Sequence, residues 1–220
     1  MDEEIVKILQ DANDEKTTEE IMTKEIIEQD IASGQAIIFG KNVAFTRREF
    51  LDGKMSIMIP TEWTDLPLEL AKQKYPYENR PPIIITDVTT TINFTVHYLP
   101  QPLEYEAVAE FTKVLKGYTD KGVRCKFWEE DVIEEEEGRP IGWFDFTVSG
   151  ADADLYNFVC CTSLDHRALL ISFNCYESVK ERWQMVAFGM INTLQLFPSE
   201  VKMQVKKERE LYECPNNDKR

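Results

Sequence analysis

The sequence is poor in histidine, in long apolar runs and in the short motifs of common enzyme families. Its 220 residues include two histidines, His97 and His166, and a Ser-His-Asp or Cys-His site needs one of them beside its nucleophile. The glycine-rich dinucleotide motif, the P-loop, H-E-x-x-H and G-x-S-x-G are absent. No apolar run approaches the roughly 18 residues of a membrane-spanning helix. We therefore expect no catalytic residues, no cofactor and no membrane insertion.

The five cysteines follow no known framework. Their number is odd and no C-x-x-C pair occurs, which argues against both a disulfide scaffold and a zinc ribbon. Cys160 and Cys161 are adjacent in a β-like run, where we expect them to be buried as small apolar side chains. The segment 11–15 begins like a calcium loop, but Lys16 and Met22 stand where glycine and the bidentate glutamate belong. We expect no metal site.

Negative charge is in large excess. The chain has 40 acidic residues against 25 basic ones, which gives a formal net charge of −15. Such a chain does not bind nucleic acid or an anionic membrane through bulk electrostatics. The opening Met-Asp-Glu-Glu is the opposite of a signal peptide's basic start, so we expect the protein to be cytoplasmic.

The acidity is concentrated in an N-terminal arm, residues 1–34. The first 30 residues carry eleven acidic residues and three lysines, and the first aromatic residue is Phe39. Apolar residues at helical spacing predict two short amphipathic helices, the second capped by Thr18 and ended by Gly34. Helices this short are marginal alone in water, so they pack on the main domain, on a second copy or on a partner. A homodimer formed through this arm is therefore one expectation.

Residues 35–198 are predicted to form the main domain, and residues 199–220 a polar tail. The stretches 83–87 and 91–99 predict a hairpin, and Pro102 is expected to open a helix. Four further β-runs are joined by connections short enough for antiparallel hairpins. These runs are 123–133, 140–149, 155–163 and 168–175. In the clearest helix, which follows them, Ser178 and Glu181 have the spacing of a capping box.

Two of the β-runs carry apolar residues on both faces. Trp143 alternates with Phe144, and Leu170 alternates with Ile171. A strand that is buried on both faces needs helices on both sides of its sheet. The sequence therefore predicts an α+β fold, a three-layer α/β/α sandwich with a central antiparallel sheet, plus an N-terminal helical extension.

Three segments carry a family resemblance. Residues 55–63 place a strand, Pro60 and Trp63 in succession, and they are followed by a hairpin at 92–96 and a closing helix at 183–196. Together they resemble the PsbP-like fold, shared by the photosystem protein PsbP, a Ran-binding nuclear import factor and bacterial DcrB-like proteins. The run Lys74-Tyr75-Pro76-x-x-x-Arg80-Pro81 looks like one found in uncharacterised bacterial members. The resemblance covers residues 43–197.

The resemblance implies binding rather than catalysis. Members act as assembly factors, as Ran-binding factors or, in one bacterial branch, as chaperones for secreted effectors with hydrophobic segments. We therefore expect a non-catalytic protein-binding module, acting as a cytosolic adaptor or as a chaperone for an exported or assembling protein. Two alternatives stay open. One is a structural subunit of a larger assembly, and the other is an enzyme with a carboxylate-based site at Glu129, Glu130 or Asp131.

Aromatic residues in loops and at strand ends are the candidates for a partner-binding rim. We select Trp63, Tyr75, Tyr77, Arg80 and Trp128, because aromatic and arginine side chains are frequent anchors at protein interfaces. The alternative for the loop at 75–77 is that it only packs onto the sheet.

An acidic run occupies residues 129–137, with seven acids in nine residues. A hairpin tip this charged is usually solvated and prevents edge-to-edge pairing of sheets. We expect such a solvated tip, or a docking patch for a basic partner.

Overall fold

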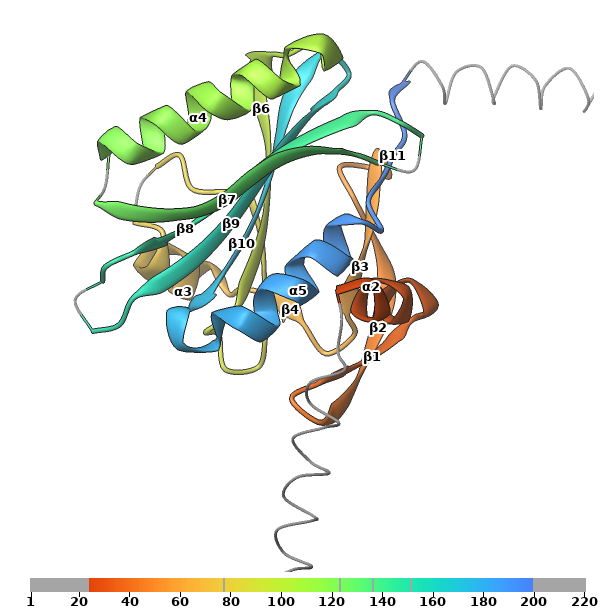
Figure 1. Ribbon diagram of the computed structural model, residues 1–220, viewed down its shortest axis with the longest axis vertical. Helices are drawn as coiled ribbons and strands as arrows, with labels where there is room; N and C mark the ends of the chain where they lie inside the picture. Colours follow the sequence, from red (N-terminus) through yellow and green to blue (C-terminus); the bar gives the residue numbers. More distant parts are fainter. Residues whose placement is uncertain (1–23, 77, 123, 136, 151, 200–220) are drawn as a thin grey trace, which may run out of the picture.

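A seven-stranded antiparallel sheet forms the centre of the structure, a computed structural model that describes residues 24–199 except 77, 123, 136 and 151. Its strand order is β4-β5-β6-β10-β9-β8-β7 (Figure 1). The strands are β4 Thr64–Asp65, β5 Ile83–Thr86, β6 Asn93–Pro102, β7 Cys125–Glu134, β8 Pro140–Val148, β9 Leu155–Leu164 and β10 Arg167–Tyr176. The predicted β5–β6 hairpin and the antiparallel run of four strands from β7 to β10 are confirmed.

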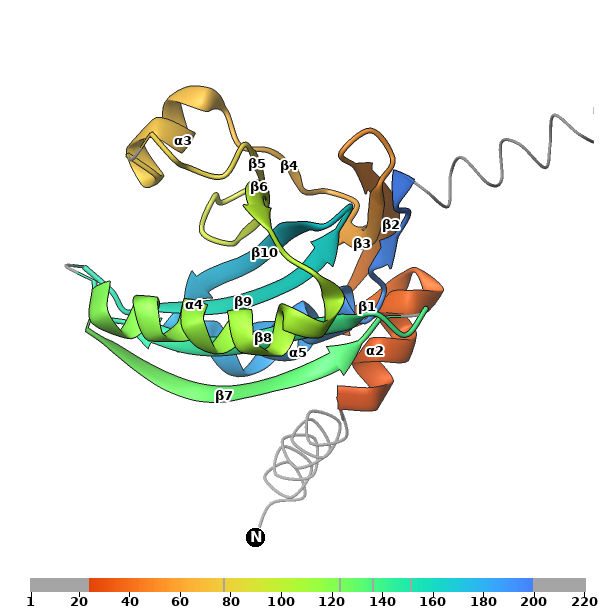
Figure 2. The same ribbon diagram turned by 90° about the horizontal axis from the view of Figure 1, so that it is seen from above.

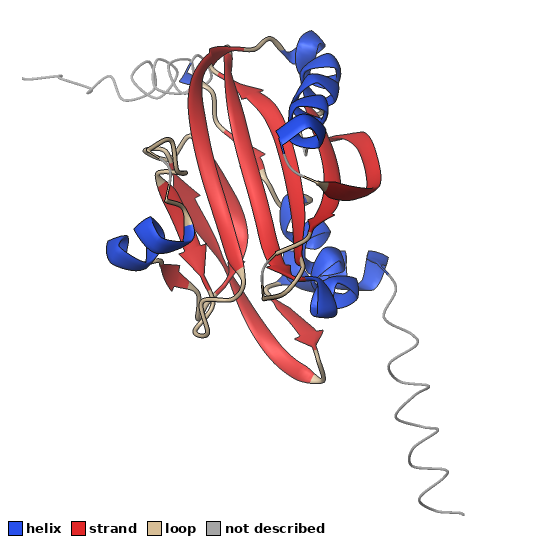
Figure 3. Cartoon of the chain, turned by 90° about the vertical axis from the view of Figure 1, so that its left-hand side faces the viewer, coloured by secondary structure: helices blue, strands red, loops and turns tan. Residues whose placement is uncertain are grey.

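Helices lie on both faces of this sheet. The helices described are α2 Lys24–Ser33, α3 Leu68–Lys74, α4 Val108–Gly122 and α5 Lys180–Ile191. On one face, Thr112 of α4 places its Oγ1 3.1 Å from the Cys161 sulfur. On the other face, the Phe188 ring of α5 meets Trp143 edge-on, with 4.5 Å between ring centroids. Figures 2 and 3 show α4 lying along the sheet near β7 to β9. The predicted three-layer sandwich is confirmed.

A second sheet packs beyond α5, and its separation from the central sheet was not predicted. Its order is β1-β2-β3-β11, with β1 Gln35–Ile38, β2 Lys41–Phe50, β3 Met55–Pro60 and β11 Gln195–Leu196. The chain turns after Pro60, where the Trp63 N–H donates to the Pro60 carbonyl at 3.0 Å. After this turn the chain enters the central sheet through the short strand β4, which pairs with β5. α5 therefore contacts β3 on one side and β9 and β10 on the other.

The described part of the N-terminal arm packs on its own chain. Ile27 and Ile31 of α2 are buried in the main core, and a Cβ added to Gly189 of α5 would lie 2.7 Å from the Ile31 side chain. Gly34 follows α2 with a φ of 100°, so it ends the helix as predicted. The first predicted helix and the predicted cap Thr18 lie outside the described residues.

Two predicted helix starts are wrong. A 3-10 turn, Glu177–Val179, precedes α5, and no side chain caps that helix, so the Ser178–Glu181 capping box does not form. Pro102 ends β6 rather than opening a helix, because the Leu103 N–H still bonds the His166 carbonyl across the sheet at 3.0 Å. α4 begins six residues later, at Val108.

Candidate functional site

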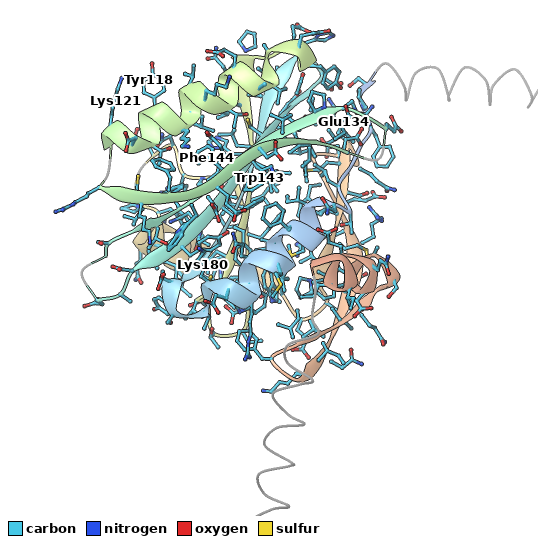
Figure 4. All side chains as sticks on the ribbon, viewed as in Figure 1. Tyr118, Lys121, Glu134, Trp143, Phe144 and Lys180 are labelled. Atoms are coloured by element: carbon cyan, nitrogen blue, oxygen red, sulfur yellow. The ribbon has the colours of Figure 1, made fainter. Side chains whose placement is uncertain are left out.

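Two adjoining cavities open beside the N-terminal end of α5. One has a volume of about 610 Å³ and is lined by Phe39, Trp128 and residues 177–182. The other, of about 570 Å³, is lined by Phe39, Trp63, Trp183 and parts of β2 and the β5–β6 loop. Because Phe39 borders both, we call them together the aromatic groove, defined by Phe39, Trp63, Trp128 and Trp183. Figure 4 labels Lys180, which lies in the first turn of α5 at this site.

Phe39 lies between the two cavities, and its backbone has an unfavourable conformation. It is the first residue of the two-residue turn between β1 and β2, where Phe39 and Gly40 have φ values of 53° and 68°. Such turns favour asparagine and glycine, and a bulky residue at positive φ costs about 1–3 kcal/mol. The ring is nevertheless 38% exposed, with its centroid 6.0 Å from that of Trp183. The turn itself does not need phenylalanine here, which makes Phe39 a candidate for binding.

Trp63 and Trp183 form the floor of the groove. Their ring centroids are 5.8 Å apart, and they lie 6.3 and 6.0 Å from the ring of Phe173 on β10. Trp63 follows the turn after Pro60, and Trp183 belongs to the apolar face of α5. Both indoles are buried in the main core, so the floor is rigid and apolar.

Trp128 forms one wall from the edge strand β7. A β-bulge shifts the register of β7 against β8 at this point. The Nζ atoms of Lys126 and Lys180 lie 3.6 and 3.2 Å from the centre of the indole, and its Nε1 donates to Thr147 Oγ1 at 2.9 Å. The ring is 36% exposed. Both cation–π contacts hold the indole at the mouth of the cavity.

Asp145 fixes this wall from behind the bulge. It is 0% exposed, and its Oδ1 accepts the Glu129 backbone N–H at 2.7 Å, a donor that the bulge leaves without a backbone partner on β8. Its Oδ2 accepts from the Tyr156 hydroxyl at 2.9 Å and from Gln184 Nε2 at 2.8 Å. Burial raises the pKa of Asp145 and, strongly, that of Tyr156. The carboxylate thus ties β7 and β9 to α5 and keeps the groove preformed.

Charged groups of both signs border the groove. The guanidinium of Arg182 lies 4.7 Å from the centre of the Phe39 ring, while Glu177 and Glu181 line the same cavity. An apolar floor with a charged rim is typical of a site that binds another protein or an organic ligand.

The sequence-predicted rim is divided between the two faces of the central sheet. Trp63 and Trp128 lie in the aromatic groove. The Tyr75 hydroxyl accepts from Asn174 Nδ2 at 3.1 Å, and Asn174 faces opposite to its strand neighbour Phe173, which contacts Trp63.

Arg80 joins Tyr75 rather than the groove. Its guanidinium donates to the Tyr75 carbonyl at 3.2 Å, and burial raises the pKa of the Tyr75 hydroxyl. Tyr75 packs beside Leu66, Ala71 and Ile84, which close the space between α3 and the sheet. These contacts give the loop a packing role on the α3 side. Tyr77 lies outside the described residues.

Sequence reasoning missed Phe39 and Asp145. Asp145 is the one acidic residue in the apolar run Trp143-Phe144-Asp145-Phe146, and an isolated acid in a strand buried on both faces indicates a buried polar network. Phe39 next to Gly40, between two short β-runs, is a bulky residue where a hairpin turn favours a small polar one.

The carboxylates considered for an enzymatic site do not form one. Glu129, Glu130 and Asp131 are all exposed on β7, and Glu130 pairs with Lys116 of α4 at 2.9 Å. That prediction required a concave pocket around these groups, so it is wrong. Within the described part of the chain, no cluster of three or more His, Cys, Asp or Glu side chains is arranged to hold a metal ion.

One residue of the acidic run is buried, which corrects the expectation of a solvated tip. The Glu135 side chain is 1% exposed and lies 3.0 Å from Arg139 Nε. Its Oε1 also accepts the backbone N–H groups of Glu137 and Arg139. Arg139 in turn donates to the Leu196 carbonyl at 2.8 Å. The ion pair therefore holds the β7–β8 turn together, and the hydrogen bond from Arg139 joins this turn to β11.

Comparison with known proteins identifies the fold. No family model and no curated protein match the sequence. Cyanobacterial PsbP from Synechocystis sp. PCC 6803 is similar in structure, with a TM-score of 0.50 and 11% identity over 70% of this chain and 92% of that one. The chain has a PsbP-like fold, and at this identity the likeness extends to the fold alone.

Two further solved structures are similar at lower scores. LpqN of Mycobacterium tuberculosis, involved in cell envelope biogenesis, has a TM-score of 0.45 and 11% identity over 71% of this chain and 92% of that one. PA94 of Pseudomonas aeruginosa, a protein of unknown function, has a TM-score of 0.44 and 12% identity over 70% and 99%. Among the described residues, no helix is long and apolar enough to cross a membrane.

Proposed function

We propose that this chain is a protein-binding module and that its partner binds in the aromatic groove. As an adaptor or chaperone, it would hold a segment of an exported or assembling protein. The observation that carries the proposal is Phe39, a half-exposed ring kept at positive φ between two cavities. Backbone strain of this kind persists where the surrounding structure imposes it and a function uses it.

The groove has the composition of a protein interface. Aromatic residues dominate the few positions that provide most of the binding free energy at such interfaces. Here four aromatic side chains line two adjoining cavities of about 570 and 610 Å³, and Phe39 borders both. This composition fits a partner segment that packs an aromatic or aliphatic side chain against the exposed side of Phe39, beside the Trp63–Trp183 floor. Polar groups of the same segment would meet the lysines on Trp128.

The groove is preformed, which lowers the cost of binding. Asp145 bonds three elements at once, and the floor tryptophans are buried against Phe173. A surface that is already ordered loses little conformational entropy when it binds. Less of the favourable interaction free energy is therefore offset by ordering the groove, and the affinity is higher.

The test is capture of partners from the native host by the tagged full-length chain, with mass spectrometry. The wild-type chain is compared with Phe39→Asn and Trp128→Ala, and with Leu68→Ala as the matched control. Leu68 is 62% exposed on α3, away from the groove. We expect a partner in fixed stoichiometry that is lost from both groove variants and retained by the control. The same partner on all four chains, or none on any, would contradict the proposal.

A further inference from the structure

One apolar stripe of α4 faces away from the sheet. Val108 and Thr112 are the buried residues of this helix, and they begin the row that contacts β8 and β9. A second apolar row runs one position to the side, through Ala107 in the preceding turn, Phe111, Val114 and Tyr118, at the i, i+4, i+7, i+11 spacing of one helix face. Phe111, at the inner edge of this row, is partly buried against Leu103, Val108 and Ala168. Val114 is 46% exposed and Tyr118 is 71% exposed.

A shallow apolar depression continues this stripe. It has a volume of about 400 Å³ and is lined by residues 102–104 together with Ala107, Glu110, Phe111 and Val114. Figure 4 shows Tyr118 and Lys121 projecting from the outer end of α4, away from the sheet. The helix thus presents a ridge and a hollow to the outside. Contiguous exposed apolar surface of this kind marks an interaction site.

Gly117 lies in the same exposed face, one turn beyond Val114. A Cβ added there would meet no atom within 4 Å, so the fold of this chain does not require glycine. Glycine inside a helix costs about 1 kcal/mol relative to alanine. A glycine kept at this cost, beside an apolar stripe, allows the backbone of another helix to approach closely.

The charges around the stripe differ between the two ends of the helix. Glu104, Glu106 and Glu110 surround its N-terminal end. Lys116 and Lys121 belong to its C-terminal half, with Asp120 as the one acid among them, and Lys116 already pairs with Glu130 of β7 at 2.9 Å. Two copies of α4 that run antiparallel would bring the acidic end of each against the basic end of the other. A parallel arrangement would place like charges together.

We propose that α4 is the interface of a homodimer, in which a second copy of this chain covers the apolar stripe by antiparallel, two-fold packing. With Val114 at the two-fold axis, Phe111 lies three residues before the axis and Gly117 three residues after it. Phe111 of each copy therefore lies level with Gly117 of the partner subunit along the helix direction, on the opposite side of the contact line. Lys121 and Ala107 are each seven residues from the axis, so Lys121 lies level with the partner's Ala107. Lys121 is therefore close to the partner's Glu106 and Glu110, which are near Ala107 in the sequence. A two-fold axis makes the contact self-complementary.

This interface is small and the dimer is correspondingly weak. α4 has 15 residues, which gives a length of about 22 Å. Two helices of that length form a contact at the low end of interface sizes, below about 1,200 Å² of total buried surface. The protein should change from monomer to dimer with concentration, in the range of micromolar or weaker dissociation constants.

The experiment is sedimentation velocity of the full-length chain over a concentration series. The variants are Val114→Glu, Lys121→Glu and the triple variant E106K/E110K/K121E, with Leu68→Glu as the control on α3. Val114→Glu places two carboxylates at the axis, and Lys121→Glu places a third acid beside Glu106 and Glu110 of the partner. Thermal unfolding of each variant establishes that it is folded.

We expect the dissociation constant to rise about ten-fold or more for Val114→Glu and Lys121→Glu, and to return toward the wild-type value in the triple variant. Leu68→Glu should dimerise as the wild type does. A chain that stays monomeric at every concentration would overturn the proposal. A dimer that survives Val114→Glu would also overturn it, and its loss on Ile8→Glu would assign the contact to the N-terminal arm.

Discussion

The Asp145 carboxylate accepts the backbone N–H of Glu129 at 2.7 Å, directly behind the β-bulge that carries Trp128. A side chain from the neighbouring strand thus replaces the missing ladder bond. The same carboxylate receives the Tyr156 hydroxyl and Gln184, so one buried group fixes the edge strand, the sheet and α5 relative to one another. The position of Trp128 in the aromatic groove depends on this group.

Replacing Asp145 by asparagine should destabilise the protein and loosen the Trp128 wall. The amide nitrogen that replaces one carboxylate oxygen cannot accept a hydrogen bond, so at least one of the buried donors loses its partner, at a cost of about 1–3 kcal/mol. Chemical denaturation measures the loss, and tryptophan fluorescence should show an emission shift to the red in the folded variant. Glu129→Gln, whose side chain is exposed, is the control and should stay within about 0.5 kcal/mol of the wild type. Equal stability of Asp145→Asn and the wild type would contradict this role.

Phe39→Asn should separate binding from folding. Asparagine is favoured at positive φ in a two-residue hairpin turn, which offsets the lost ring contact with Trp183. We expect the unfolding free energy to stay within about 1 kcal/mol of the wild type, measured in urea. Global unfolding of this variant would show that Phe39 is needed for the fold, and would remove the main argument for its binding role.

Glu135→Ala should be far more destabilising than Glu134→Ala. Removal of Glu135 leaves the backbone N–H groups of Glu137 and Arg139 without their buried acceptor, at a cost of about 1–3 kcal/mol for a buried donor left unpaired, while Glu137 still pairs with Arg139 at 2.7 Å. Glu134 is exposed, so its removal should change the unfolding free energy by less than about 0.5 kcal/mol. The melting temperatures of the two variants decide the point. Equal melting temperatures would show that Glu135 stabilises the fold no more than Glu134 does, as expected of a fully solvated acidic tip.

Asp165 should make stability depend on pH in the acid range. Burial alone would raise its pKa, but the hydrogen bonds from Lys54 Nζ at 2.6 Å and from Ser199 outweigh it and lower the pKa. The folded state therefore favours the carboxylate. The resulting stability is fully present above the unfolded pKa of about 3.9 and is lost as the pH falls through the lower folded pKa. Urea midpoints of the wild type and Asp165→Asn should differ at pH 6 and converge in this acid range; a constant difference would count against it.

The sequence predicted the layers well, because they follow from local periodicity. Alternation in β5–β6 and in β7 to β10, with short connections, indicated antiparallel strands, and Trp143 beside Phe144 required helices on both faces. Helix faces were harder to predict. In α4 the buried row begins with Val108 and Thr112, while Val114 and Tyr118 are exposed, and Thr112 packs directly against Gly142, where an added Cβ would collide with it.

The candidate site was half predictable. Trp63 and Trp128 were selected for their residue type and loop position, and both lie in the groove. Tyr75 is close to Trp63 in sequence, yet the sheet lies between them, which only the three-dimensional fold reveals. The second sheet and the separation of α5 from solvent depend on long-range contacts that periodicity does not encode.

The most direct test of the aromatic groove as a binding site is the affinity of the captured partner, measured by isothermal titration calorimetry with the wild type and Phe39→Asn. If Phe39 is an anchor of the groove, the variant should bind about ten-fold more weakly or worse, a loss of about 1.4 kcal/mol, while remaining folded. Leu68→Ala should bind as the wild type does. Equal affinities for wild type and Phe39→Asn would place the partner elsewhere on the surface and contradict the central claim.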